Sequence, residues 1–262
     1  MTNETAPSSR WSAKSEVALE DRFLVSLKAP AKLTLTLRIT GTRSDGYHEI
    51  DAEMITIDLC DELELTEAPE TSIELIGATS DVPAGPENLV CKALDHVGRR
   101  ARVELRKNIP SRAGLGGGSA DAAAVLRWAG VTDPLDVVSL GSDIAFCLVG
   151  GRARVTGAGE LIEPLPFVDH VVTLFHPPIE CSTIEVFKAW DALGGPIGPG
   201  DNDLEQAALA VAPDLARWRD RLRDATGQEP RLAGSGSTWF VHGAYPGDGR
   251  MVARAVPAGW NG

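Results

Sequence analysis

A cluster of glycines near the middle of the chain has the residue types that most clearly indicate chemistry. Between an alternating stretch and an alanine-rich stretch typical of a helix, the sequence holds Gly114, Gly116, Gly117, Gly118 and Ser119. Glycine permits positive φ and the close approach of a ligand to the backbone. The start of a helix adds unpaired N–H donors and a positive dipole end, both of which favour phosphate. Ser119 can cap that helix, or its hydroxyl can face the phosphates or a bound cation. The pattern predicts a nucleoside triphosphate site.

Three alternatives to a triphosphate site fit the glycine cluster less well. A tight turn before a buried helix is the plainest, but consecutive glycines cost backbone entropy in a fold that does not use them. The common P-loop is excluded because no Gly-Lys-Ser/Thr follows, so a lysine that reaches the β- and γ-phosphates must come from elsewhere. A dinucleotide fingerprint would place an acidic residue about 20 positions later, and that spacing is not matched.

The elements that position this loop are indicated by hydrophobic periodicity, which predicts an α+β fold in two lobes. Alternation at period two predicts strands within 23–39, 54–65, 72–76, 101–107, 153–157, 171–175 and 238–242. Helical spacing predicts helices within 88–97, after the glycine cluster, and within 134–140, 184–193, 204–211 and 215–225. We expect a disordered extension over 1–22, an N-terminal domain over 23–163 and a C-terminal domain over 164–262.

Composition excludes several classes of function. The chain has 262 residues, 43% of them apolar, which suits one large domain or two modest domains that share a cleft. A net charge of −12 argues against partners such as nucleic acid or an anionic membrane. No apolar run reaches the length of a membrane span, and the polar N-terminus lacks the apolar core of a secretory signal. Four scattered cysteines without a Cys-x-x-Cys pair indicate reduced thiols in the cytoplasm rather than zinc ligands or disulfides.

Three separated segments carry a resemblance to a known family. They are Ala29-Pro30-Ala31-Lys32-Leu33, the glycine cluster, and Ala233-Gly234-Ser235-Gly236-Ser237. Their order resembles that of the three motifs of the GHMP kinase superfamily. Further matches at 41–49, 140–143 and 202–205 resemble members whose acceptor alcohol carries a cytidylyl group. The resemblance covers about 28–262 and implies a two-lobed GHMP kinase fold. Its N-terminal ATP-binding lobe would resemble domain 2 of ribosomal protein S5, and its C-terminal lobe would be ferredoxin-like.

The resemblance also implies a reaction and its catalytic residues. ATP would transfer its γ-phosphoryl group to the 2-hydroxyl of a methylerythritol unit linked to cytidine diphosphate, a step of the methylerythritol phosphate route to isoprenoids. Asp143 matches the family's catalytic aspartate, which accepts or orients the alcohol proton, and Lys32 matches a lysine that stabilises the developing charge. Without the family match, Asp143 fits a helix N-cap and Lys32 a solvated strand lysine. Mg²⁺ is expected as the counter-ion of ATP, with no protein residue assigned to it.

Binding residues are likewise assigned by the family match. For ATP they are Asn88, Pro110, Ala113, Gly114, Leu115, Gly116, Gly117, Gly118 and Ser119, with Asn88 near the adenine. For the small-molecule cytidylyl substrate they are Thr34, Tyr47, His48, Phe187, Gly234 and Ser235. Tyr47 and Phe187 are expected to stack on opposite faces of the cytosine, and His48 to hydrogen-bond its polar edge. For Gly234 and Ser235, an ordinary turn between a helix and a strand accounts for the pattern equally well.

Several features depart from the family pattern. Thr34 stands where the family usually has asparagine, and Ala145 where proline is common. The segment before Leu140 is short, and we expect the chain to stop before the family's final strand, which would expose a sheet edge.

Two other functions and the oligomeric state stay open. Another GHMP kinase would act on a sugar, homoserine or a mevalonate-type alcohol, but such substrates offer no base for Tyr47, His48 and Phe187 to bind. A non-catalytic relative that only binds ATP or a metabolite has little reason to keep both Lys32 and Asp143. Monomer and homodimer are equally compatible with the sequence.

Overall fold

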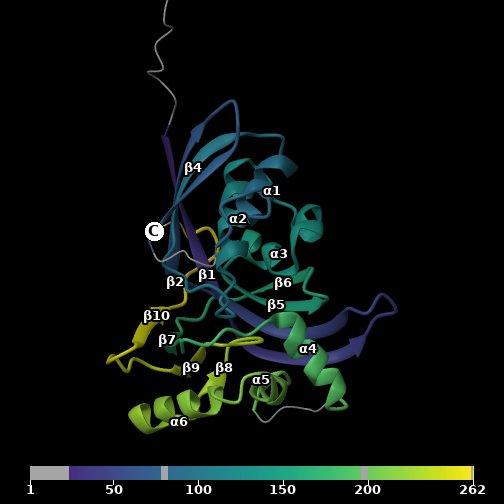
Figure 1. Ribbon diagram of the computed structural model, residues 1–262, viewed down its shortest axis with the longest axis vertical. Coiled ribbons are helices and arrows are strands. Elements are labelled where there is room, and N and C mark those ends of the chain that lie inside the picture. The colour runs from purple at the N-terminus through teal and green to yellow at the C-terminus, as the bar shows by residue number, and fades with distance from the viewer. Residues whose placement is uncertain (1–23, 78–81, 196–199, 261) are drawn as a thin grey trace, which may run out of the picture.

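The computed structural model shows two lobes stacked along the long axis of the molecule (Figure 1). It describes residues 24–77, 82–195, 200–260 and 262, so the extension expected over 1–22 lies outside the described residues. The upper lobe contains β1 (Leu24–Thr42), β2 (His48–Glu67), β3 (Ser72–Ile76), α1 (Leu89–His96), β4 (Ala101–Arg106), α2 (Gly117–Trp128), the 3-10 helix η1 (Pro134–Leu140), α3 (Ser142–Val149), β5 (Arg152–Gly157) and β6 (Leu161–Leu165). The lower lobe contains β7 (Val171–Phe175), α4 (Thr183–Ala192), α5 (Glu205–Val211), α6 (Leu215–Thr226), β8 (Arg231–Leu232), β9 (Trp239–His242) and β10 (Arg250–Arg254).

A long antiparallel ribbon of β1 and β2 forms the spine of the upper lobe. The main path of its sheet runs in the order β3-β4-β2-β5-β6, and β1 pairs with β2 beside this path. The pairing register shifts between Pro30 and Lys32, so a bulge accommodates the proline inside the strand. The tip of the ribbon reaches α4 of the lower lobe (Figure 1).

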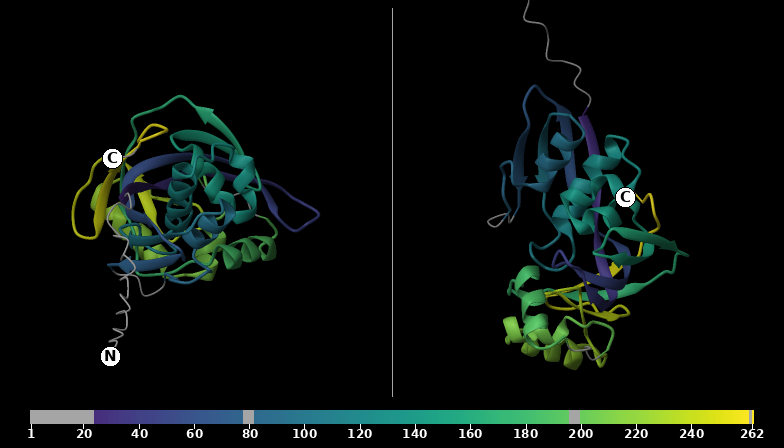
Figure 2. Two further views of the ribbon diagram at one scale, coloured as in Figure 1. Left: turned by 90° about the horizontal axis from the view of Figure 1, so that it is seen from above. Right: turned by 90° about the vertical axis from the view of Figure 1, so that its right-hand side faces the viewer.

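Three helices cover one side of this sheet, with α2 between α1 and α3 (Figure 2). The middle of α2 is buried along its length from Ala120 to Leu126. Its alanines present little bulk, so the helix packs closely against both β1 and its neighbouring helices. This packing holds the start of α2, and the glycine cluster before it, at the level where the lobes meet.

The lower lobe is an antiparallel sheet in the order β10-β7-β9-β8, accompanied by α4, α5 and α6. Trp239 and Phe240 of β9 are fully buried. Periodicity did not predict a strand after 238–242, but β10 pairs there with β7 over Arg250–Arg254. The stretch RMVAR mixes exposed and buried positions, so its alternation is weak in the sequence.

The two lobes are joined by more than the chain connection. Leu37 of β1 forms a bridge with Asn202, and Ile57 of β2 forms one with Ala255. The first sheet also extends past the predicted boundary at 163/164, since Pro164 and Leu165 pair with β5. Within the described ranges, no helix is both long and apolar enough to cross a membrane.

Candidate active site

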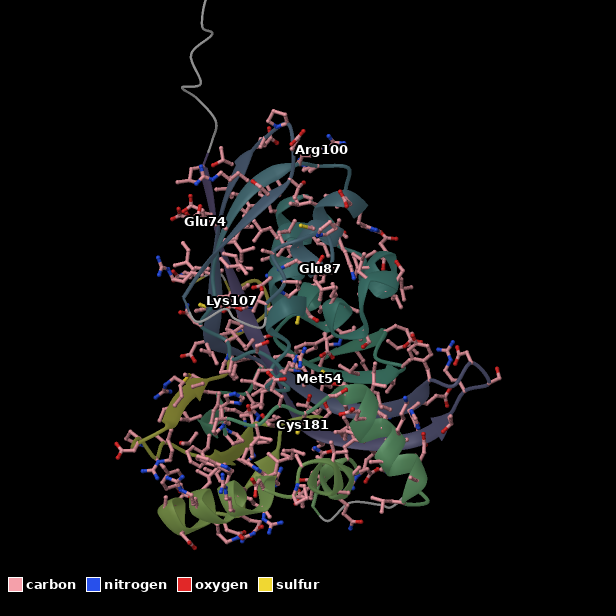
Figure 3. The ribbon with its side chains drawn as sticks, viewed as in Figure 1. Met54, Glu74, Glu87, Arg100, Lys107 and Cys181 are labelled. Carbon is pink, nitrogen blue, oxygen red and sulfur yellow. The ribbon has the colours of Figure 1, made fainter. Side chains whose placement is uncertain are left out.

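A cavity of about 860 Å³ lies where the two lobes meet. Its wall combines β1, the tip of the β1–β2 ribbon, the starts of α1, α2 and α3, and one side of α4. Figure 3 labels three wall residues, Met54 of β2, Glu87 in the loop before α1 and Lys107 directly after β4. The volume suits a ligand of drug size or larger.

The structure brings nearly all predicted site residues to this one cavity. Those that line it are Lys32, Thr34, Tyr47, His48, Asn88, Pro110, Ala113, Gly114, Gly116, Gly117, Gly118, Ser119, Asp143, Phe187, Gly234 and Ser235. Leu115 differs, because its side chain belongs to the hydrophobic core. Its carbonyl accepts a hydrogen bond of 3.0 Å from the N–H of Lys32, so it fixes the glycine loop to β1.

The glycine loop has a conformation that side chains would disturb. Gly114 and Gly116 have φ of +77° and +67°, in the left-handed region. A Cβ on Gly114 would lie 2.4 Å from the carbonyl oxygen of Ala233, and one on Gly116 would lie 2.8 Å from Cγ of Lys32. The loop therefore touches both the first and the third predicted motif, and glycine is required at these two positions.

Helix α2 begins within the glycine cluster, so the prediction that Ser119 caps it is wrong. The N-cap is Gly116, which has no side chain to accept a hydrogen bond, and Ser119 lies in the first turn. The N–H of Ala120 makes the first bond to the carbonyl of Gly116 at 2.8 Å. The three preceding N–H groups consequently lack a partner within the helix, and the start of α2 can bind an anion.

Lys32 and Asp143 meet in the wall of the cavity. Nζ of Lys32 lies 3.3 Å from Oδ2 of Asp143 and 3.2 Å from Oγ1 of Thr34. The side chain of Lys32 is buried, whereas that of Asp143 is 36% exposed and so accessible to a ligand. Neither of the simpler roles holds: Lys32 is not a solvated strand lysine, and Gly141 rather than Asp143 is the N-cap of α3.

The third motif is held beside this pair by residues that the sequence analysis did not assign a role. A Cβ on Gly234 would lie 3.6 Å from both Nζ of Lys32 and Oγ1 of Thr34. Asn202, buried at the lobe junction, donates from Nδ2 to the carbonyls of Gly234 and Leu232 at 2.7 and 2.9 Å. The hydroxyl of Ser235 is 2.9 Å from that of Thr183 at the start of α4. These contacts fix the loop between the lobes.

The expected base-binding residues Tyr47, His48 and Phe187 lie together at one end of the cavity. The ring of His48 stacks on Phe187 with centroids 4.8 Å apart, while Tyr47 is 65% exposed at the rim. Nε2 of His48 is 2.8 Å from Oδ1 of Asp191, a residue that the sequence analysis did not single out. Tyr47, His48 and Phe187 therefore line the same cavity, and the His48 ring packs against the ring of Phe187.

Asn88 has a local structural role as well as a place on the wall. It is the N-cap of α1, where its Oδ1 accepts from the N–H of Val90 at 2.8 Å. Its Nδ2 donates to the carbonyl of Pro83 at 2.7 Å, which holds the loop before α1 against the cavity. A position near a bound base is compatible with this geometry.

A buried charged cluster below the glycine loop is the largest feature that the sequence analysis missed. Nζ of Lys107 pairs with Oδ2 of Asp61 and, at 2.6 Å, with Oδ2 of Asp121 of α2. Oδ1 of Asp61 accepts from the N–H groups of Asn108 and Ile109 at 2.5 and 2.8 Å, so this carboxylate fixes the entry to the loop. Burial raises the pKa of Asp121 to about 8 despite the nearby lysine.

The position of Lys107 was a usable signal. It directly precedes 108–119, and the absence of a P-loop lysine had already called for a cation from elsewhere. Asp61 was harder to find, because it lies 46 residues away in the sequence and meets Lys107 only through sheet pairing.

Comparison with known proteins agrees with this geometry. Residues 88–151 match the model of the GHMP kinases N terminal domain. The 4-diphosphocytidyl-2-C-methyl-D-erythritol kinase of Paracoccus denitrificans is 40% identical over 253 residues, which cover 89% of this chain and 92% of that protein. The chain belongs to this kinase family. It is accordingly an ATP-dependent GHMP kinase.

Solved structures support the same family and fold. A crystal structure of a 4-(cytidine 5'-diphospho)-2C-methyl-D-erythritol kinase has a TM-score of 0.71 and 29% identity, covering 88% of this chain and 99% of that one. The predicted mixed α+β GHMP kinase fold is therefore confirmed. A homoserine kinase from Cytophaga hutchinsonii, at a TM-score of 0.58 and 16% identity over 94% of this chain and 98% of that one, shares the fold alone.

Proposed function

We propose that the chain transfers the γ-phosphoryl group of ATP to the 2-hydroxyl of 4-diphosphocytidyl-2-C-methyl-D-erythritol. The observation that carries the proposal is the contact of 3.3 Å between Lys32 and Asp143 in a cavity that also holds the start of α2 and His48. Family membership supports the substrate, because the relatives carry its name. An acceptor without a base would leave the His48 end of the cavity unused.

Phosphoryl transfer depends on alignment and charge stabilisation more than on covalent help from the protein. The unpaired N–H groups at the start of α2 would hold the phosphates of ATP. Asp143 would accept or orient the proton of the 2-hydroxyl, and the Lys32 cation would stabilise charge that develops on the transferred group. Thr34, through its hydrogen bond to Lys32, would keep the ammonium in place.

Mg²⁺ is proposed to enter with ATP as its counter-ion. Among the residues that the structure describes, no group of three His, Cys, Asp or Glu side chains could hold a metal ion. Mg²⁺ often keeps several waters and binds substrate phosphates with few protein ligands.

The test is ADP formation by the purified protein with Mg²⁺, ATP and either the cytidylyl compound or 2-C-methyl-D-erythritol 4-phosphate, which lacks the base. We expect turnover with the cytidylyl compound only. Equal turnover of both acceptors would show that the base is not recognised. Binding of ATP with no turnover of either acceptor would favour a non-catalytic relative.

A further inference from the structure

One face of α4 immobilises the ring of His48. Phe187, Trp190 and Asp191 stand at helical spacing, so they lie on the same side of the helix. Phe187 stacks on the imidazole at 30° between ring planes, and Trp190 meets it edge-on with centroids 5.5 Å apart. Asp191 closes the third side through Nε2. The ring is therefore held in one orientation by the lower lobe, although His48 itself comes from the β1–β2 ribbon.

The contact with Asp191 decides where the proton of the neutral ring resides. An ionised carboxylate can only accept hydrogen bonds, so Nε2 must be the atom that carries the proton. In the neutral imidazole, Nδ1 then keeps its lone pair and can only accept. Across the described ranges no hydrogen bond to Nδ1 is formed, and His48 lines the cavity although its side chain is only 9% exposed. The ring thus offers a ligand one oriented acceptor.

We propose that Asp191 is a positioning residue which, by fixing the tautomer of His48, makes this end of the cavity select a cytosine over a uracil base. The inference rests on the proposed function, in which a cytidylyl group lies against His48. Cytosine carries an exocyclic amine where uracil carries a carbonyl oxygen. Nδ1, which can only accept, can receive a hydrogen bond from the amine of cytosine. Against the carbonyl oxygen of uracil it would place two acceptors face to face, which is repulsive. Selection therefore includes a repulsive element against the wrong base.

The first arm of the test reports the tautomer without any substrate. We would record ¹⁵N NMR spectra of the His48 ring in the wild-type protein and in Asp191→Leu, at a pH where the imidazole is neutral. The wild type is expected to carry its proton on Nε2. In Asp191→Leu a second population with the proton on Nδ1 is expected, because the leucine offers no acceptor. A wild-type ring protonated on Nδ1, or a tautomer unchanged by the substitution, would overturn the proposal.

The second arm measures base selection by calorimetric binding of 4-diphosphocytidyl-2-C-methyl-D-erythritol and its uridylyl counterpart. We expect the wild type to bind the cytidylyl compound at least about tenfold more tightly, which one well-formed hydrogen bond and one avoided clash can supply. Asp191→Leu should reduce that ratio to about threefold or less. Asp191→Asn should lie between the two, since a carboxamide can accept or donate at Nε2.

The matched control is Glu185→Gln, which removes a negative charge from the same helix at an exposed residue that does not line the cavity. It should retain the wild-type ratio. Equal binding of both compounds by the wild type, or an unchanged ratio in Asp191→Leu, would overturn the inference. Turnover of the cytidylyl compound is measured separately, so loss of base selection in an active kinase is distinguished from failure of the proposed function.

Discussion

Single residues carry the proposed chemistry, and Asp143 is the one whose change should affect it most. Asp143→Asn keeps the size of the side chain but removes its ability to accept a proton. We expect kcat to fall by about 10²- to 10⁴-fold, the usual contribution of general-base catalysis. ATP binding should change little, because the start of α2 is untouched. Steady-state kinetics and calorimetric titration with ATP measure the two effects.

The control for this substitution is Asp136→Asn, which changes an exposed aspartate of η1 that does not line the cavity. It should keep wild-type turnover. An Asp143→Asn variant with full activity would remove Asp143 from the mechanism.

Asp121 should make the stability of the protein depend on pH. Its pKa is raised from 3.8 to about 8 by burial, so the folded protein holds a proton that the unfolded chain has lost between these values. The free energy of unfolding contributed by this group is therefore present at low pH and falls as pH rises through the window. Burial lowers the pKa of Lys107, but the charges of Asp121 and Asp61 outweigh burial and raise that pKa above 10.5. Lys107 therefore contributes to the pH dependence of stability only at higher pH.

Asp121→Asn removes this titration. We expect its free energy of unfolding to decrease less than that of the wild type between about pH 5 and about pH 8, as measured by urea denaturation. Asp95→Asn, at an exposed position of α1, is the control and should follow the wild type. Parallel pH profiles for the wild type and Asp121→Asn would refute the assignment.

Motifs in the sequence located individual wall residues but not the contacts among them. Lys32, Asp143 and the glycines are each identifiable from short local patterns. The partners Asp61, Asp191 and Asn202 lie far from them along the chain and are brought to them by strand pairing and by the meeting of the lobes. No local pattern distinguishes Asp191 from any other aspartate on an exposed helix face.

At the scale of elements, the junction between the glycine loop and α2 is the most constrained. Gly116→Ala would place a Cβ 2.8 Å from Cγ of Lys32, at a residue with φ of +67°. We expect a loss of stability of about 1–2 kcal/mol from the left-handed conformation alone. A lower kcat/KM should accompany it, because Lys32 must move. Thermal unfolding and steady-state kinetics measure these effects.

Gly98 offers a matched control for that substitution. It has φ of +64°, and a Cβ there would meet nothing within 4 Å. Gly98→Ala should show a similar loss of stability with unchanged kcat/KM. Equal kinetic effects in the two variants would indicate that the contact with Lys32 is not important.

Most elements were predictable because their hydrophobic periods are long and regular. Hydrophobic alternation indicated the β1 and β2 regions, but the bulges that let them continue as single long strands depend on the partner strand. The two residues of β8 and the mixed pattern of β10 are too short or irregular to show alternation. The start of α2 was misplaced because glycine is a poor helix former in general, although Gly117 and Gly118 are helical here.

At the scale of the whole molecule, Asn202 couples the lobes at the site. It bridges to Leu37 of β1 and donates to the carbonyl of Gly234. Asn202→Ala would leave two buried carbonyls without their donor, so we expect a loss of about 1–3 kcal/mol in unfolding free energy. Because the Gly234 loop lies beside Lys32, kcat/KM should fall as well. Denaturant unfolding and steady-state kinetics measure these quantities.

The neighbouring Asp201 serves as the control, since its side chain is half-exposed and pairs with Arg231 at 2.8 Å. Asp201→Asn should cost less than about 1 kcal/mol, as exposed ion pairs do, and should leave kcat/KM unchanged. If both variants behaved alike, Asn202 would have no special role in joining the lobes.

The two-lobed α+β arrangement was indicated both by hydrophobic periodicity and by the resemblance to GHMP kinases. Periodicity indicated the elements and an α+β class but not which strands pair across the junction. The pairing of Ile57 with Ala255 joins residues almost 200 positions apart, and no local pattern encodes it. The sequence also did not show that the first sheet extends to Leu165. β6 is largely exposed, so it has no clear apolar face to indicate a strand.

The most direct test of the proposed reaction is ³¹P NMR of a mixture of the protein, Mg²⁺, ATP and 4-diphosphocytidyl-2-C-methyl-D-erythritol. We predict that the ATP signals are replaced by those of ADP and one new phosphomonoester, attached at the 2-hydroxyl of the acceptor. Release of inorganic phosphate alone, or a phosphate on a different hydroxyl, would contradict the proposal that Lys32 and Asp143 align this alcohol with the γ-phosphate.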